Sequence, residues 1–93
     1  MRIARVFGSV TLNRVHPSFV GARLRLAVPL TLANLRGEAP ESDEELVVWD
    51  ELGAGEGTLI ALSEGAEAAQ PFRPEVKPVD AYAAALIDRI EIE

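Results

Sequence analysis

The sequence contains no cysteine. This absence excludes a disulfide framework, a thiolate nucleophile and a zinc site built on cysteine ligands. It also contains a single histidine, His16, which stands beside Pro17 in an expected loop. A metal site would therefore depend on carboxylates alone, and the acidic residues do not have the EF-hand spacing. We expect no metal and no cofactor, and the simplest interpretation of His16 is an exposed loop residue.

Long apolar runs are missing as well. No stretch approaches the roughly 20 residues of a membrane-spanning helix. The opening residues 1–6 alternate like a strand and are too short for a signal peptide. The sequence therefore predicts a cytosolic protein with no membrane partner.

Aromatic residues are few, with one Trp, one Tyr and three Phe, although 48% of the chain is hydrophobic. The core is therefore expected to be aliphatic. The 93 residues predict one domain, spanning 1–93. A domain of this size has a small core, so association with other copies would stabilise it.

Acidic residues are absent from residues 1–37, which contain six arginines, whereas residues 38–93 contain all fifteen acids and only three basic residues. The net charge of −6 disfavours a nucleic-acid partner, because such partners are bound through their phosphates. We expect the basic and acidic halves to lie against each other and to neutralise locally.

Apolar and polar residues alternate in several segments, as they do in β-strands with one buried face. In the first, Gly8 interrupts the pattern and predicts a bulge or bend. In the second, Leu24, Leu26, Val28 and Leu30 are expected on one face. The predicted strands cover residues 2–12, 24–30, 45–49, 58–63 and 90–93.

One short helix is expected to begin around Pro78-Val79-Asp80 and to continue through the alanines up to 85, because proline suits a first turn and alanine propagates a helix. A helical turn is expected at 63–69 and a long loop at 31–44. The predicted fold class is mainly β, a small five-stranded OB-like barrel with one short α-helix. Pairing of the first and last strands would place the basic residues near Arg2 opposite the acidic residues near Glu91.

The segment Gly53-Ala54-Gly55-Glu56-Gly57 is the most unusual in the sequence. It is not a phosphate-binding loop, because neither a Lys-Ser/Thr pair nor a following helix is present, and Glu56 would repel a phosphate. Glycine at this density indicates positive φ angles, or a backbone packed too closely against another backbone for side chains. A tight turn needs only one or two glycines, so the third glycine favours close packing against another backbone.

Catalytic residues are not expected. Ser63 lies in no nucleophile-elbow motif. Asp50, Asp80 and Asp88 could be combined as acid–base pairs, but aspartates more often cap helices and turns. Trp49 ends an apolar strand and is expected in the core or in an interface.

Three stretches, in order, carry a resemblance to a known family: residues 1–10 (MRIARVFGSV), residues 53–57 (GAGEG) followed by an apolar strand and Ser63-Glu64-Gly65, and Pro78-Val79-Asp80 leading to Ile87-Asp88. Together they resemble the bacterial microcompartment vertex proteins, the pentamer-forming shell family of the EutN/CcmL type (BMC-P), found in carboxysomes and catabolic metabolosomes.

The resemblance implies a single vertex domain over residues 1–93, a homopentamer and a structural, non-enzymatic role at the five-fold vertices of a microcompartment shell in the bacterial cytoplasm. It implies hexameric and trimeric shell proteins as partners, and neither nucleic acid nor membrane. We expect the glycine segment and the proline segment at a subunit interface or at the axial pore. The candidate residues are Gly53, Ala54, Gly55, Glu56, Gly57, Pro78, Val79 and Asp80.

Two other function classes remain open at this stage. An OB-like barrel could bind single-stranded nucleic acid or a small ligand through its arginine-rich first half, although such binders usually interleave aromatic with basic residues. The second of these alternatives is a small-molecule enzyme of an unrecognised kind. A native mass of five copies would favour the shell protein, whereas a monomer retained on single-stranded DNA would favour the binding module.

Overall fold

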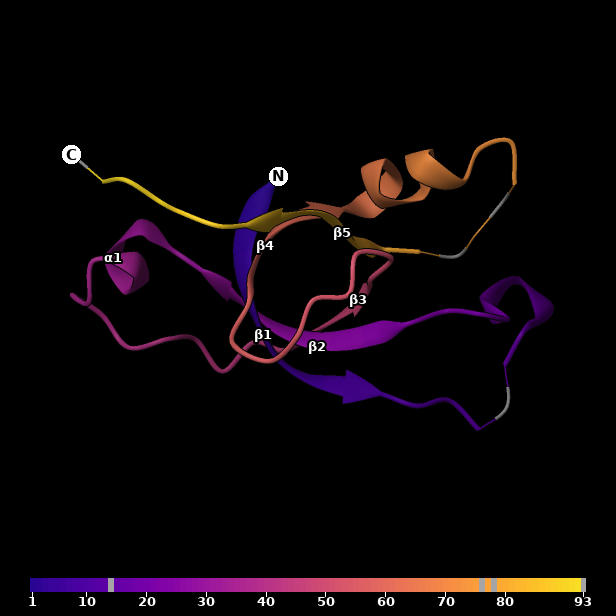
Figure 1. Cartoon of the computed structure of the whole chain (residues 1–93), viewed down its shortest axis with the longest axis horizontal. Helices are drawn as coiled ribbons and strands as arrows, with labels where there is room; N and C mark the ends of the chain where they lie inside the picture. Colours follow the sequence, from indigo (N-terminus) through magenta and orange to yellow (C-terminus); the bar gives the residue numbers. More distant parts are fainter. Residues whose placement is uncertain (14, 76, 78, 93) are drawn as a thin grey trace.

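Five strands form a closed barrel in the computed structural model, which describes residues 1–13, 15–75, 77 and 79–92. Their order around the barrel is β1-β2-β3-β5-β4 (Figure 1), with all neighbours antiparallel except β3 and β5. The predicted mainly β barrel is thus confirmed. The strands are β1 (Arg2–Val10), β2 (Leu24–Leu30), β3 (Leu46–Trp49), β4 (Leu59–Glu64) and β5 (Ala81–Ile87).

The first four strands lie where the alternation predicts them, within two residues at each end. The bulge expected at Gly8 is confirmed, because the register between β1 and β2 shifts between Val6 and Gly8. The predicted buried face of β2 is wrong. Ala27 pairs with the core residue Val6, and cross-strand partners share a face, so Ala27 points inward. Val28 points outward beside Arg5 and is nevertheless buried, because the acidic residues 41–45 cover that side.

The C-terminal helix predicted at 78–85 is wrong, because β5 (Ala81–Ile87) occupies this segment. Ala81 and Ala83 are 7% and 1% exposed and alternate with Tyr82, which is half-buried, so the first half of β5 supplies two alternate residues to the core. Helix propensity is a weak preference, and pairing with β4 on one side and β3 on the other overrides it.

The strand predicted at 90–93 is also wrong, since β5 ends at Ile87 and residues 88–92 pair with no strand in the described part of the chain. Glu93 lies outside the described residues. Consequently β1 pairs with β2 and β4, not with the end of the chain.

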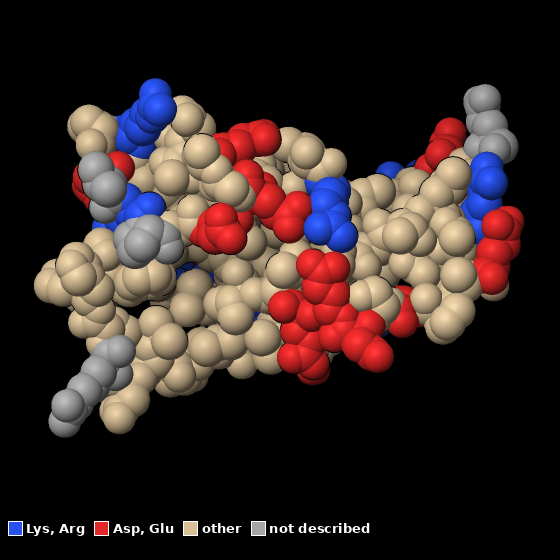
Figure 2. Space-filling model, turned by 180° about the vertical axis from the view of Figure 1, so that it is seen from behind, with Lys and Arg blue, Asp and Glu red and all other residues tan. Residues whose placement is uncertain are grey.

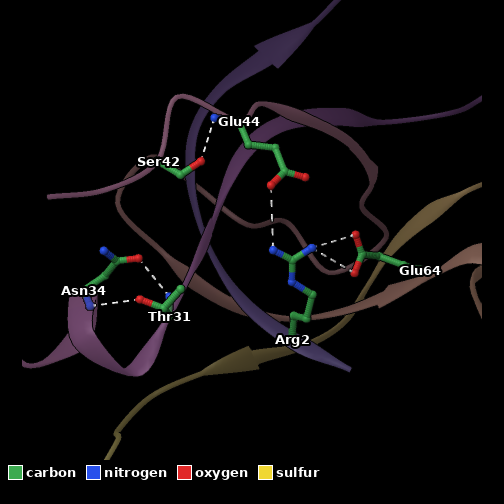
Figure 3. Close-up of polar contacts among 6 residues, drawn as sticks. All are labelled: Arg2, Thr31, Asn34, Ser42, Glu44 and Glu64. Carbon is green, nitrogen blue, oxygen red and sulfur yellow. Dashed lines mark hydrogen bonds and ion pairs between the residues drawn. The ribbon is translucent and has the colours of Figure 1, made fainter. Parts of the chain in front are cut away.

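The one α-helix lies elsewhere, at α1 (Leu32–Leu35), inside the region expected to be a loop. A capping box begins it: the Asn34 backbone N–H donates to Thr31 Oγ1 (3.2 Å), and the Thr31 N–H donates to Asn34 Oδ1 (2.8 Å; Figure 3). Two 3₁₀ helices, η1 (Pro17–Phe19) and η2 (Gly65–Phe72), complete the fold. The second confirms the helical turn expected after β4. No helix among the described residues is long and apolar enough to cross a membrane.

The barrel interior is small and aliphatic, as predicted. Alanine fills five of its nine buried positions, and this allows the strands to close tightly around little volume. The buried core residues are Ala4, Val6, Ala27, Val48, Ala54, Ile60, Leu62, Ala81 and Ala83.

The folded molecule is more elongated than a compact domain of the same chain length. Its extents are 43 × 26 × 20 Å and its radius of gyration is 13.7 Å, against about 12 Å for a compact domain of this length. Figure 1 shows why: the connection between β1 and β2 projects from one end, and the last residues run out from the other.

Candidate functional site

The glycine segment connects β3 to β4, and these strands are not neighbours, because β5 lies between them. The segment is therefore not a hairpin turn; it crosses in front of the barrel strands (Figure 1). Its end is attached to β1: the Gly57 N–H donates to the Val6 carbonyl (2.7 Å), and the Val6 N–H donates to the Thr58 carbonyl (2.9 Å). We call residues 53–57 the glycine loop.

The three glycines of this loop meet different requirements. Gly53 and Gly57 have φ angles of +80° and +84°, which side chains rarely tolerate. Gly55 does not have a positive φ, and a Cβ built on it would come no closer than 4.0 Å to Thr58 Oγ1. Within one subunit, nothing requires glycine at position 55.

Asp50 anchors the start of the crossing. Its carboxylate is fully buried and accepts hydrogen bonds from the backbone N–H groups of Leu52 (2.9 Å) and Ala54 (2.7 Å) and from Arg25 Nε (3.2 Å). Burial alone would raise the pKa of Asp50, but these three donors outweigh it and hold the pKa below its ordinary value. Asp50 is therefore a turn cap, as aspartates usually are, and not a poised acid or base.

The other candidate residues occupy different environments. Ala54 is buried in the core, whereas Glu56 is exposed at the tip of the glycine loop. Val79 is half-buried and Asp80 exposed, and the Asp80 carbonyl accepts from the Gly65 N–H (2.9 Å) at the start of η2. Pro78 lies outside the described residues. The structure thus attaches the glycine loop to β1 and residues 79–80 to η2, so the two segments are held by different elements.

An aromatic cluster lies beside residues 79–80, and it was not predicted from the sequence. Trp49 lies between Phe19 (5.7 Å between ring centroids, tilted) and Phe72 (4.8 Å, edge to face), and Phe72 contacts Tyr82 edge-on (5.5 Å). Lys77 Nζ lies 5.9 Å from the Trp49 ring. These residues come from five separate segments, so no local pattern could have indicated the cluster. Trp49, expected in the core or in an interface, is buried within its own subunit.

Arginines of β1 bind carboxylates of the acidic half, as the charge distribution predicts. Arg2 pairs with Glu64 (3.3 Å) and Glu44 (3.8 Å; Figure 3), and Arg5 pairs with Glu41, whose pKa is lowered by the Arg5 hydrogen bond. Figure 2 shows acidic side chains gathered over the middle of one face with a basic side chain among them. The face therefore does not present the open basic patch that a nucleic-acid binder needs.

No group of three or more potential ligands among the described residues is arranged to hold a metal ion. What the structure offers instead is surface that a neighbour could cover: a tight glycine loop, and exposed apolar residues that include Val20, Val47 and Leu86.

The comparisons with known proteins agree along the whole chain. It is 31% identical over 90 residues to the bacterial microcompartment shell vertex protein PduN of Salmonella typhimurium, covering 97% of this chain and 98% of that relative. Its structure is similar to that of CcmL from Gloeobacter violaceus, with a TM-score of 0.86 and 30% identity over 100% of this chain and 91% of the other. It is also similar to GrpN, a pentameric microcompartment shell protein from Rhodospirillum rubrum, with a TM-score of 0.82 and 26% identity over the whole of both chains.

The family described as "Ethanolamine utilisation protein EutN/carboxysome" matches residues 1–88. This match takes in all five strands of the barrel and the glycine loop. The chain therefore belongs to the EutN/CcmL family.

Proposed function

We propose that this protein is a structural shell component that forms pentamers and caps the five-fold vertices of a bacterial microcompartment. The observation that carries the proposal is the similarity to GrpN over the full length of both chains, since GrpN is a pentameric microcompartment shell protein. The similarity to the vertex protein PduN supports the position in the shell.

The proposal extends to the surroundings of the protein. Residues 1–93 act as one vertex domain in the bacterial cytoplasm, and hexameric and trimeric shell proteins are the neighbours of the pentamer. The role is structural and not enzymatic. A closed shell tiled by six-fold units needs five-fold units at its vertices, and a small barrel that gains stability from association suits that position.

The ring itself is tested by native mass spectrometry at micromolar concentration. We expect five copies, joined by one head-to-tail contact that repeats around the axis. A stable monomer would overturn the proposal.

The position in the shell is tested separately, by electron microscopy of particles assembled from the six-fold shell proteins with and without this protein. Closed particles are expected only when it is present. Regular closed particles that form without it would contradict the vertex role even if the ring exists.

We further propose that the glycine loop lies at a subunit contact or at the axial opening, with Glu56 as the charged side chain offered there. The support is Gly55, whose missing side chain nothing inside the subunit explains and which a closely approaching neighbour would require. Val79 and Asp80 belong to a second contact. They line, with Val47 and Trp49, a shallow apolar hollow of about 180 Å³ that a neighbour would cover.

The Gly55→Val variant tests the loop. We expect an unchanged β-sheet signal in circular dichroism and loss of the oligomer in native mass spectrometry, because the subunit has room for the side chain and the ring does not. Glu67→Val, which places the same residue on an exposed position of η2, is the matched control and should leave the ring intact. If Gly55→Val forms an intact ring with wild-type stability, the glycines serve only to form the turn and make no subunit contact.

A further inference from the structure

A groove opens where β1 and β2 leave the barrel. The two strands stay paired as far as Val10 and Leu24 and then separate. The groove between them has a volume of about 500 Å³, and its lining includes two basic residues and no acidic one. Its principal side chains are Val10, Leu12, Val15, Phe19, Val20 and Arg23.

Beside this groove, β1 has an open backbone edge. Its pairing with β4 covers only Arg2–Arg5, and the glycine loop takes the N–H and carbonyl of Val6. Residues 8–10 pair with β2 on one side, and no strand in the described part of the chain lies on the other. An unpaired edge of this kind accepts an added strand.

Residues 88–92, which we call the tail, have the complementary properties. They leave β5 and run out from the barrel without a partner strand (Figure 1). Ile90 and Ile92 alternate with Arg89 and Glu91, which is the period of a strand with one apolar face. Ile92 is 40% exposed, and the Arg89–Glu91 ion pair (2.7 Å) lies in solvent.

The tail cannot reach the groove of its own subunit. The connection between β1 and β2, whose residues line the groove, and the tail lie toward opposite ends of the longest axis, which measures 43 Å (Figure 1). Five residues span at most about 17 Å when fully extended. A head-to-tail ring, by contrast, joins one surface patch of each copy to a different patch of the next, so two distant segments of the subunit can meet across the contact.

Charge also favours a contact between the groove of one copy and the tail of another. Arg25 is held by Asp50, whereas Arg23 is exposed and forms no ion pair with any carboxylate among the described residues. Glu91 is the acidic residue between the two isoleucines of the tail.

We propose that the tail of one copy adds a short strand to the open edge of β1, at residues 8–10, in the next copy around the ring and alongside its groove. Ile90 and Ile92 pack on the apolar lining, and Glu91 pairs with the exposed Arg23 side chain. This inference rests on the ring of the proposed function and specifies which surfaces form its contact.

Cysteine cross-linking tests the contact, since the sequence contains no cysteine of its own. In a chain carrying both Val20→Cys and Ile92→Cys, oxidation is expected to link successive copies and to give a ladder up to the ring size on denaturing gels. Glu67→Cys with Ile92→Cys is the matched control, because Glu67 is exposed on η2 and lines neither the groove nor the hollow at Val79; it should give no ladder.

Native mass spectrometry of the same reduced samples separates the two proposals. A ring that yields no ladder from the Val20–Ile92 pair overturns the tail contact and leaves the vertex function standing. A monomer overturns both.

A charge exchange provides a readout that does not depend on new cysteines. Glu91→Arg should raise the dissociation constant of the contact by about fivefold, the upper range for an exposed ion pair. Combination with Arg23→Glu should restore it. A double variant that assembles no better than Glu91→Arg alone would contradict the contact.

Discussion

Asp50 shows how a single residue organises the crossing between β3 and β4. Its buried carboxylate accepts three hydrogen bonds, two of them from the backbone that leads into the glycine loop. An ionised group without such partners would be costly to bury. The carboxylate therefore stabilises the fold as long as it remains charged.

Asp50→Ala should lower the free energy of unfolding by about 3 kcal/mol, because it leaves two backbone N–H groups and Arg25 without their acceptor. The control Asp43→Ala removes an exposed carboxylate from the acidic loop and should change stability by less than about 0.5 kcal/mol. Urea denaturation of the three proteins at pH 7 measures the difference. Equal midpoints would show that the cap does not stabilise the fold.

The pH dependence of this difference follows from the lowered pKa of Asp50. A carboxyl whose folded pKa lies below its unfolded pKa contributes stability above the unfolded value, 3.8, and loses it as the pH falls through the folded value. The gap between wild type and Asp50→Ala should therefore be complete at pH 7 and shrink below about pH 4. A gap that stays constant down to pH 2 would contradict a charged Asp50.

The glycine loop gives a second test at the residue scale. Gly53→Ala should destabilise the subunit by about 1–2 kcal/mol, since its φ of +80° strains any residue with a side chain. Gly55→Ala should be neutral toward unfolding of the subunit, because its backbone is ordinary and the space around it is open. Chemical denaturation of both variants measures this, and equal losses would contradict the different roles of the two glycines.

Among the elements, η2 (Gly65–Phe72) depends on packing more than on its own sequence. It contains Pro71 and buries only Ala68, so local propensity contributes little to it. Phe72, between Trp49 and Tyr82, ties it to β3 and β5. The contacts of one aromatic side chain thus hold this element against the barrel.

Phe72→Ala should therefore release η2 while the barrel survives. We expect a loss of about 2 kcal/mol, below the roughly 3–5 kcal/mol of a fully buried phenylalanine, because Phe72 is half-buried. Hydrogen exchange should speed up at residues 65–73 and remain slow in β1 and β4. Uniform acceleration across all strands would mean that η2 and the barrel unfold as one unit.

The whole molecule is elongated, and two segments project from opposite ends of the barrel (Figure 1). A ring would cover them, and binding between folded copies stabilises the folded state by mass action. The melting temperature should therefore rise when the protein concentration increases from 1 to 100 µM. A variant that loses the ring, such as Gly55→Val, should melt at a temperature independent of concentration. A wild-type protein that behaves in the same way would contradict assembly in this range.

Local sequence patterns were enough to predict the four N-terminal strands, the bulge at Gly8, the aliphatic core and the bend at the glycine loop. Each of these follows from local chemistry: alternation of apolar residues, or backbone angles that only glycine adopts easily. The match between basic and acidic halves was also predictable, because opposite charges on a small surface lie close to each other whatever the topology.

The strand at the C-terminal end, the individual ion pairs and the aromatic cluster depend on the packing of the whole chain. Residues 81–87 are alanine-rich and have the local preference of a helix, but they form a strand because the barrel closes only when β5 fills the gap between β3 and β4. Which carboxylate each arginine binds, and which segments bring aromatic rings to Trp49, depends on contacts between residues far apart in the chain. Local propensities differ by less than about 1 kcal/mol per residue, so the pairing and burial gained over a whole strand outweigh them.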